Sequence, residues 1–158
     1  GLVLILYLHE WKEIDCYMNG SNEWVFKNYL ISTDKSLLSI DAIKGLLEKS
    51  YWASQRPISV IETSIANSIC IGIYHQEVQV GFARVVTDYA TMFWIADVFI
   101  HEKHRGNGLG KELVKYILDI PAVKGLRGVL MTKDAHGLYK QFGFEMIPEY
   151  AMVRFPLT

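Results

Sequence analysis

The chain has 158 residues, of which 51% are hydrophobic and 21% are charged, the size and balance of one globular domain. Its formal net charge of -1 provides no long-range attraction to phosphate backbones or anionic membranes, so nucleic acid and membrane surfaces are not expected as partners. Cys16 and Cys70 lack metal-ligand spacing and are expected to stay reduced, in a cytoplasmic protein.

The first residues include an apolar run from Leu2 to Leu8. It is far shorter than the roughly 20 residues of a membrane helix, and it lacks the basic region and cleavage site of a signal peptide. We therefore expect a strand there. We assign residues 1–25 to an N-terminal extension of uncertain role and residues 26–158 to one domain.

The first half of the domain predicts a strand, two helices and a β-rich stretch. A strand is expected over 29–32, a helix over 39–49 with Ser39 able to cap its free amides, and a second helix opening at Pro57. Strands are then expected over 69–74, 78–86 and 92–100. The short turns between these three strands favour an antiparallel meander.

The second half predicts helices between short strands. Apolar residues at helical spacing indicate a helix from Leu109 to Ile120, which ends before Pro121. A buried strand over 128–131, a helix over 134–142 and a last strand over 151–155 follow. Strands with helices between some of them indicate a mixed α/β or α+β sheet.

The most informative stretch runs from Asp97 to Lys111, where a buried strand leads through a glycine-rich turn into a helix. The first amides of a helix have no internal partner, its dipole favours negative charge at that end, and glycine lets a ligand approach the backbone closely. Arg105 and Lys111 add positive charge. The stretch therefore predicts a phosphate-binding loop.

The glycine spacing argues against two common nucleotide-binding loops. In a Walker loop, Arg105 would occupy the first glycine position and Glu112 would replace the hydroxyl that binds magnesium. In a dinucleotide fingerprint the three glycines would be spaced Gly-x-Gly-x-x-Gly, whereas Gly106, Gly108 and Gly110 are spaced Gly-x-Gly-x-Gly. Nucleoside triphosphate hydrolysis and NAD binding are both disfavoured.

The loop resembles the cofactor loop of the GNAT superfamily of N-acetyltransferases, whose pattern Arg/Gln-x-x-Gly-x-Gly/Ala is met by Arg105, Gly108 and Gly110. The segment from Thr132 to Phe144 resembles a later family segment, a strand followed by a short helix with a tyrosine and a Gly-Phe turn. With the order of elements from 29 to 155, the likeness covers about four fifths of the chain. It implies a GNAT-type fold: a twisted, mixed, mostly antiparallel sheet of about six or seven strands, flanked by about four helices.

The resemblance also implies acetyl-coenzyme A as co-substrate, with no metal. The pantetheine arm would pair with the backbone of Val98, Phe99 and Ile100. The pyrophosphate would lie on the loop amides, which belong to Arg105, Gly106, Asn107, Gly108, Leu109, Gly110 and Lys111. Asp134 stands where many members have asparagine, and it could contact the cofactor or simply cap its helix.

In this family an amine attacks the thioester directly in a ternary complex, so one proton leaves the amine and one reaches the sulfur. Tyr139 matches the tyrosine that protonates the leaving sulfur, with a plain aromatic core residue as the alternative. Asp97, the carboxylate of the strand before the loop, is the candidate base. Pairing of Asp97 with Arg84 is the alternative, as is proton transfer through water with no dedicated base.

The acceptor region is expected between the first two helices, which form one wall of the acceptor cleft in this family. Tyr51, Trp52 and Arg56 could stack on a substrate or clamp its carboxylate, or equally form an aromatic plug beside a surface charge. Phe82 and Arg84 could complete the cleft. The acceptor is an unidentified small-molecule or peptide amine, and a non-catalytic coenzyme A-binding module is the rival interpretation. Exposed edge strands favour a homodimer.

Overall fold

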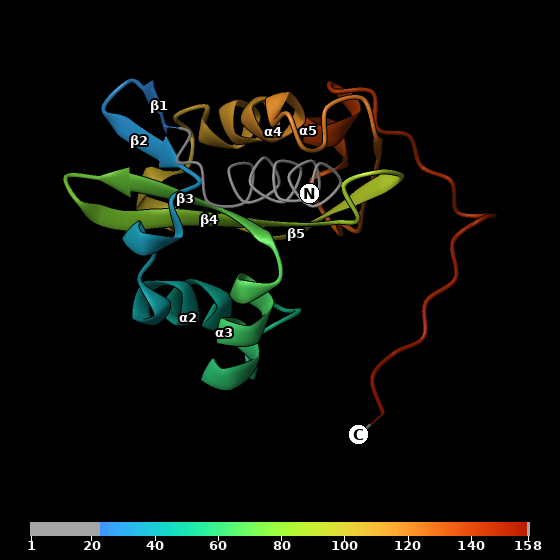
Figure 1. The fold of residues 1–158 in the computed structure, drawn as a ribbon, viewed down its shortest axis with the longest axis horizontal. Helices are drawn as coiled ribbons and strands as arrows, with labels where there is room; N and C mark the ends of the chain where they lie inside the picture. The colour runs from blue at the N-terminus through green and yellow to red at the C-terminus, as the bar shows by residue number, and fades with distance from the viewer. Residues whose placement is uncertain (1–22, 158) are drawn as a thin grey trace, which may run out of the picture.

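The computed structural model describes residues 23–157, in which one six-stranded sheet carries helices on both faces (Figure 1). The strands cross the sheet in chain order: β1 (Glu23–Phe26), β2 (Tyr29–Ser32), β3 (Ile69–His75), β4 (Val78–Thr87), β5 (Met92–Ile100) and β6 (Arg127–Leu130). The first five pair antiparallel and β6 pairs parallel with β5. This confirms the predicted mixed, mostly antiparallel sheet.

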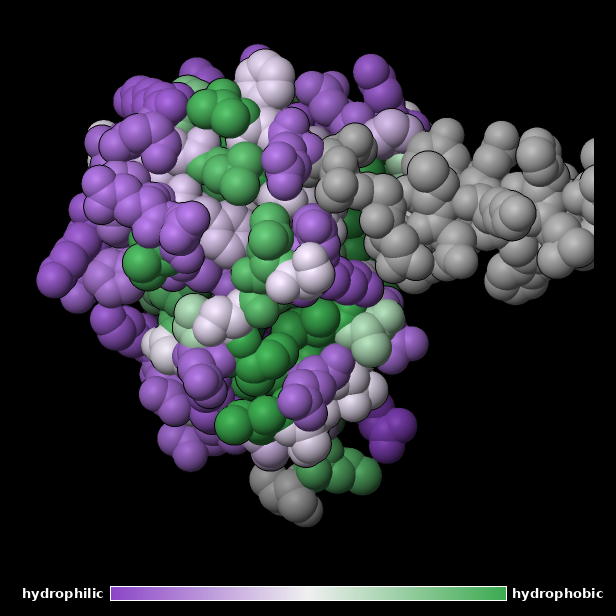
Figure 2. Space-filling model, turned by 60° about the vertical axis from the view of Figure 1, so that its left-hand side comes forward, coloured by the Kyte–Doolittle hydropathy of each residue, from purple (hydrophilic) through white to green (hydrophobic). Residues whose placement is uncertain are grey.

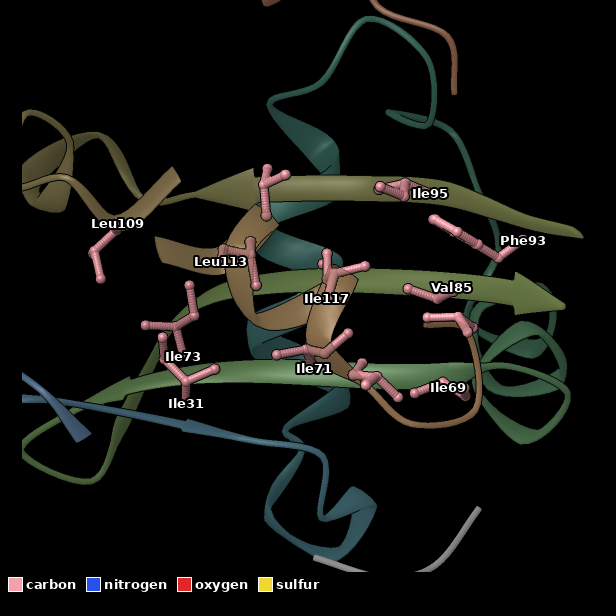
Figure 3. Close-up of a cluster of buried hydrophobic side chains, with 14 of the residues drawn as sticks. Ile31, Ile69, Ile71, Ile73, Val85, Phe93, Ile95, Leu109, Leu113 and Ile117 are labelled. Atoms are coloured by element: carbon pink, nitrogen blue, oxygen red, sulfur yellow. The ribbon is translucent and has the colours of Figure 1, made fainter. Parts of the chain in front are cut away.

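One face of the sheet is covered by α4 (Leu109–Asp119), with the short α5 (His136–Lys140) beside it. Leu109, Leu113 and Ile117 lie one turn apart along α4 and are 0–1% exposed. Figure 3 shows them pointing at the strands, where they meet side chains such as Ile71 and Val85. This apolar stripe fixes the start of α4, and therefore the glycine loop, against the sheet.

The other face is covered by α2 (Ile40–Glu48) and α3 (Ile58–Ala66). The Ser39 hydroxyl accepts a hydrogen bond from the Ala42 amide, as the predicted helix cap requires. The second core of the protein lies under these helices, where Ile43 and Ile61 pack with Phe82 and Phe99. The loop between α2 and α3 is thereby held against the middle of the sheet.

Strand β1 begins three residues before the predicted domain boundary. It forms a hairpin with β2 through Lys27 and Asn28, and Lys27 has a φ of 53°. Residues 23–25 therefore belong to the sheet. The strand expected over 2–8 and the cysteine at position 16 lie outside the described residues.

The predicted last strand over 151–155 is wrong. These residues form no strand, and Figure 1 shows the segment leading away from the body of the protein. Met152 and Phe155 are 99% and 75% exposed. An apolar pattern indicates a strand only where a neighbouring backbone can pair with it, and within the described residues no strand pairs with this segment. The helix predicted over 134–142 is also shorter at both ends, because the chain bends at residues 133–134 and forms a turn at residues 141–143.

The surface is mostly hydrophilic on the side shown in Figure 2, with apolar side chains gathered in a band down its centre. Such mixing is ordinary for a folded domain. In the described part of the chain, no helix combines the length and apolar character needed to cross a bilayer.

Candidate active site

A β-bulge in β5 determines which way the site residues face. Phe82 pairs with Phe99 but Arg84 pairs with Ala96, so β5 carries one residue more than β4 around Asp97. The φ of Asp97 is 50°, a left-handed conformation that aspartate tolerates better than most residues. Before the bulge Phe93 packs on the α4 side of the sheet, and after it Phe99 packs on the α2 and α3 side.

The strands β5 and β6 diverge at the same place. β6 pairs with β5 only from Met92 to Ile95, so among residues 23–157 no strand pairs with the β6-facing edge of β5 from residue 96 to residue 100. Within the described residues, Phe99 and Ile100 pair on one side only, with β4, and Val98 lies in the bulge. An extended ligand can add to such an open edge by backbone hydrogen bonds.

The glycine loop follows this open edge directly. Gly106 and Gly108 have φ values of 79° and 81°, and Gly108 is the residue before the first turn of α4. A Cβ atom on Gly106 would meet no heavy atom within 4 Å, so space is open above the loop. One on Gly110 would lie 3.5 Å from Leu138 and 3.9 Å from Ile100, which brings α5, the loop and the end of β5 together.

The loop amides fit an anion. Within residues 23–157, none of the six consecutive amides 106–111 donates a hydrogen bond to another group, and the first intrahelical bond of α4 runs from Glu112 to Gly108. Backbone donors left free at the start of an 11-residue helix form a positive concavity suited to phosphate oxygens. The predicted phosphate loop therefore has the required donors.

The side chains around the loop are arranged differently from the sequence-based expectation. Arg105 folds back, donating from Nε to the Ile100 carbonyl at 2.9 Å and stacking over Phe99 at 5.2 Å. Asn107 donates to the His104 carbonyl and so stabilises the loop itself. Lys27 reaches the loop from the β1–β2 hairpin, with Nζ donating to the Asn107 carbonyl at 2.8 Å.

Lys27 was missed by the sequence analysis, which placed it beside the domain boundary. Its charge lies near the open amides although 80 residues separate it from Asn107. The only sequence signal was a lysine in a two-residue turn, which by itself does not indicate a ligand contact. Lys111, by contrast, is exposed and lies beside the open amides, as expected from its place in the first turn of α4.

On the α2 and α3 side, Asp97 is the centre of an ion cluster. Its Oδ2 accepts from Arg56 Nη1 at 2.6 Å and from Arg84 Nε at 2.9 Å, while its Oδ1 accepts from Trp52 Nε1 at 3.2 Å. The carboxylate is only 3% exposed. The predicted pairing of Asp97 with Arg84 is thus present, and Arg56 joins it from the α2–α3 loop.

The protonation of Asp97 follows from this cluster. Burial by itself would raise the pKa of its carboxyl group, but hydrogen bonds from Arg56 and Arg84 and their two charges outweigh burial and hold the pKa below its usual range. Asp97 is therefore ionised at neutral pH. All three of its hydrogen bonds come from side chains that the sequence analysis placed in the acceptor region.

The α2–α3 loop forms a wall beside the open edge of β5. Tyr51 and Trp52 are 63% and 43% exposed and meet edge to face, with ring centroids 5.0 Å apart. Lys133, which follows β6, holds its ammonium 5.4 Å from the Tyr51 ring. The loop therefore reaches from the bulge in β5 to the segment after β6, on either side of the place where the strands part.

Two further predicted site residues are Phe82, which is buried in the core, and Asp134, which is exposed. Phe82 is 2% exposed and packs with Phe99 in the core below α2 and α3, so it supports the wall from beneath. Asp134 is exposed and does not cap α5, because the residue at the cap position is Ala135, whose amide donates to the Thr132 hydroxyl.

Tyr139 lies on α5, on the opposite side of the sheet from Asp97. It is 6% exposed and meets Phe144 edge to face at 5.8 Å. Among the described residues its hydroxyl has no hydrogen-bond partner. The hydroxyl oxygen is not fully buried, so it reaches the surface. Burial raises the pKa of Tyr139, which keeps the phenol protonated at neutral pH.

Within residues 23–157, no group of three or more metal-ligating side chains is placed to hold an ion.

Replacing Gly108 with alanine should destabilise the protein by about 1–2 kcal/mol, because a left-handed φ is costly for any residue with a Cβ. The new atom would lie 3.7 Å from Phe26, so crowding adds little. Gly45→Ala is the matched control, in the exposed interior of α2 with open space around its Cβ, and it should raise stability by about 0.5–1 kcal/mol. Urea denaturation measures both, and equal effects would contradict this account of the loop.

Replacing Asp97 with asparagine should cost about 3–5 kcal/mol at pH 7, because it leaves two partly buried guanidinium groups facing a neutral amide. Since the folded pKa of Asp97 lies below the unfolded value of about 3.9, its stabilisation is present above that pH and is lost as pH falls towards the folded pKa. Denaturation between pH 5 and pH 2 should therefore show a shallower pH dependence in Asp97→Asn. An unchanged slope would show that Asp97 contributes nothing through its charge.

Comparisons with known proteins agree with this geometry. Residues 66–146 match the family profile described as the acetyltransferase (GNAT) domain. A Gibberella zeae protein named as an acetyltransferase is 29% identical over 152 residues, covering 80% of this chain and 85% of that protein. A crystal structure described as a GNAT-family acetyltransferase, from Xanthomonas campestris, is 38% identical with a TM-score of 0.79, covering 84% of this chain and 96% of that one.

The same architecture recurs in more distant structures. Glucosamine-6-phosphate N-acetyltransferase from Arabidopsis thaliana is 15% identical with a TM-score of 0.61, covering 82% of this chain and 99% of that one, and so it shares the fold. The family match, the homologues and the arrangement of strand edge, glycine loop and helix lead to one conclusion. The chain belongs to the GNAT family of acetyltransferases and is an N-acetyltransferase.

Proposed function

We propose that the protein transfers an acetyl group from acetyl-coenzyme A to an amine, by direct attack within a ternary complex. The observation that carries the proposal is the row of free amides 106–111 at the end of an unpaired strand edge. These two features suit the two chemically distinct parts of coenzyme A: a pyrophosphate that needs donors, and an amide-containing arm that can pair with a strand.

In this proposal the pyrophosphate lies on the backbone amides of residues 106–111. Leu109 contributes its amide alone, because its side chain is 1% exposed in the core. Arg105 supports the end of β5 through the Ile100 carbonyl. The charge opposite the phosphates comes from the helix N-terminus, Lys111 and Lys27, so no metal is needed there.

The arm of the co-substrate would pair with the backbone of Val98, Phe99 and Ile100, on the side that β6 leaves open. Acetyl-coenzyme A supplies the acetyl group as a reactive thioester. Since the arm would run along β5 towards the bulge, the acetyl group would lie near Asp97 and the α2–α3 loop. Asp134 is exposed and away from any described contact, and we assign it no cofactor role.

Tyr139 is the proposed general acid. Its hydroxyl has no partner among the described residues, reaches the surface and stays protonated at neutral pH. A phenol in this state can donate its proton to the departing sulfur. Of the residues that the sequence singled out, Tyr139 is the one whose surroundings suit this role.

Asp97 does not have the properties of a good base. Its pKa is held low and both carboxylate oxygens already accept hydrogen bonds, so it has little tendency to take a further proton. We assign it instead to positioning Arg56, Arg84 and Trp52. The amine would then lose its proton to water.

Two expectations about the whole molecule stay predictions. A cytoplasmic location fits the free thiol of Cys70, which is buried among apolar residues. A homodimer would cover one of the outer strands, β1 or β6, whose outer edges have no partner among the described residues. The mass of the protein in solution would check the dimer.

The first experiment is a thermal-shift titration with acetyl-coenzyme A, with ATP and NAD as comparison ligands. A ligand that binds only the folded state at 100 times its Kd should stabilise the protein by about 2.7 kcal/mol. We expect a shift with acetyl-coenzyme A alone, and its loss in Gly108→Trp, which fills the space above the loop. No shift at saturation would refute the proposed co-substrate.

Tyr139→Phe should then lower kcat by roughly 100- to 10,000-fold, because it removes the proton donor while keeping the ring that packs on Phe144. The acetyl-coenzyme A thermal shift should be unchanged, which separates catalysis from binding. Release of the free thiol measures turnover. If Tyr139→Phe keeps full activity, Tyr139 is an aromatic core residue and another group supplies the proton. If the parent protein binds acetyl-coenzyme A but turns over no amine, the interpretation as a non-catalytic coenzyme A-binding module gains support.

A further inference from the structure

The ion cluster in the acceptor region carries an excess of positive charge. Two guanidinium groups, Arg56 and Arg84, face a single carboxylate, Asp97, and their side chains are 21%, 16% and 3% exposed. Half-buried charge that is not balanced is costly, and one arginine would suffice to neutralise Asp97. The second arginine leaves a net charge of about +1 in a half-buried place, which is more than the neutralisation of Asp97 requires.

Arg56 also has donors to spare. It uses one N–H, on Nη1, to reach Asp97, and within the described residues its Nε and Nη2 have no hydrogen-bond partner. Arg84 uses Nε for Asp97 and Nη1 for the Ser68 hydroxyl. A guanidinium has five N–H donors in a planar fork that matches the two oxygens of a carboxylate. Arg56 therefore presents an open fork held in place by Asp97.

The cluster lies where an acceptor would have to bind. Asp97 is the residue immediately before the strand edge Val98–Ile100, and Trp52, with 43% of its surface exposed, is fixed beside it by its hydrogen bond to Oδ1. An open groove of about 450 Å³ lies between α3 and β4, and Arg84 is the residue of the cluster that lines it. Hydroxyl groups such as those of Ser59 and Thr63 line its α3 side.

We infer that the acceptor is an amine that also carries a carboxylate, and that Arg56 and Arg84 bind this carboxylate. The inference rests on the proposed function and names the substrate class of that same site. A net charge of about +1 balances a carboxylate of charge -1 better than a phosphomonoester, which carries about -1.5 to -2 at neutral pH. The wall formed by Tyr51 and Trp52 favours an acid with an aromatic or other apolar side chain.

The carboxylate takes no part in the chemical step. In that step a bond forms between the amine nitrogen and the acetyl carbon, and the bond between that carbon and the sulfur breaks. The sulfur receives a proton and the nitrogen loses one. Arg56 and Arg84 act by orienting the amine towards the open edge of β5, so they determine specificity rather than supply protons.

The test compares acids with their matched amides. Thiol release is measured with acetyl-coenzyme A and a pool of free amino acids and dipeptides, and then with a pool of the same compounds as C-terminal amides. Loss of a charge-assisted contact should make kcat/KM roughly 10- to 100-fold lower for the amides. The amine of an amide loses its proton more readily than that of an acid, so a preference for acids cannot come from basicity.

Arg56→Gln should remove this preference by raising KM for the acids far more than for the amides. Arg84 remains paired with Asp97 in this variant, and the acetyl-coenzyme A thermal shift reports whether it folds. Arg56→Lys, which keeps the charge and loses the fork, should recover part of the preference. Lys124→Gln is the matched control, because it removes one exposed charge on the opposite side of the sheet and should change neither rate.

The outcomes separate the two proposals. Equal rates for acids and amides, an equal fall of both rates in Arg56→Gln, or no turnover of any acid would each overturn the inference about the carboxylate, provided that acetyl-coenzyme A still raises the melting temperature. Absence of that thermal shift would instead refute the proposed co-substrate. A preference for acids that is lost in Arg56→Gln and kept in Lys124→Gln would establish Arg56 as the residue that recognises the carboxylate.

Discussion

The bulge at Asp97 is the constraint on which the rest of the site depends. One extra residue in β5, at a φ of 50°, turns the side chains that follow it to the opposite face of the sheet. The bulge also comes just after the last residue pair between β5 and β6. A left-handed non-glycine residue costs about 1–3 kcal/mol, so the surroundings must hold it in place. Arg56, Arg84 and Trp52 do so through three hydrogen bonds. The open strand edge and the buried carboxylate are therefore parts of one local arrangement.

Two positive regions lie along β5 as a result, and they have different origins. The amides 106–111 form the first, and their charge belongs to the backbone at the start of α4. Arg56 and Arg84 form the second, and their charge exceeds that of Asp97. A backbone site suits a ligand part that all members of a family share, whereas a side-chain site can change by substitution. Under the proposed function, this difference would let one fold keep its co-substrate and vary its acceptor.

The glucosamine-6-phosphate N-acetyltransferase of Arabidopsis thaliana shares the architecture at 15% identity, and a shared fold by itself does not determine an acceptor. The proposed acceptor wall of this chain is the loop between α2 and α3, where Lys133 from beyond β6 holds its ammonium over the Tyr51 ring. Contacts of this kind are made by exposed side chains, and these can be substituted without disturbing the packing of the core.

The sequence by itself determined the elements that local chemistry controls. Apolar spacing set β3, β4, β5 and α4, Ser39 set the start of α2, and the glycines with positive φ marked the loop, because these signals act within a few residues. Only the tertiary structure decided that Lys27 meets Asn107, that Arg56 joins Arg84 on Asp97, and that residues 151–155 form no strand. These outcomes depend on backbones and charges that are distant in the chain and become neighbours only when the sheet forms.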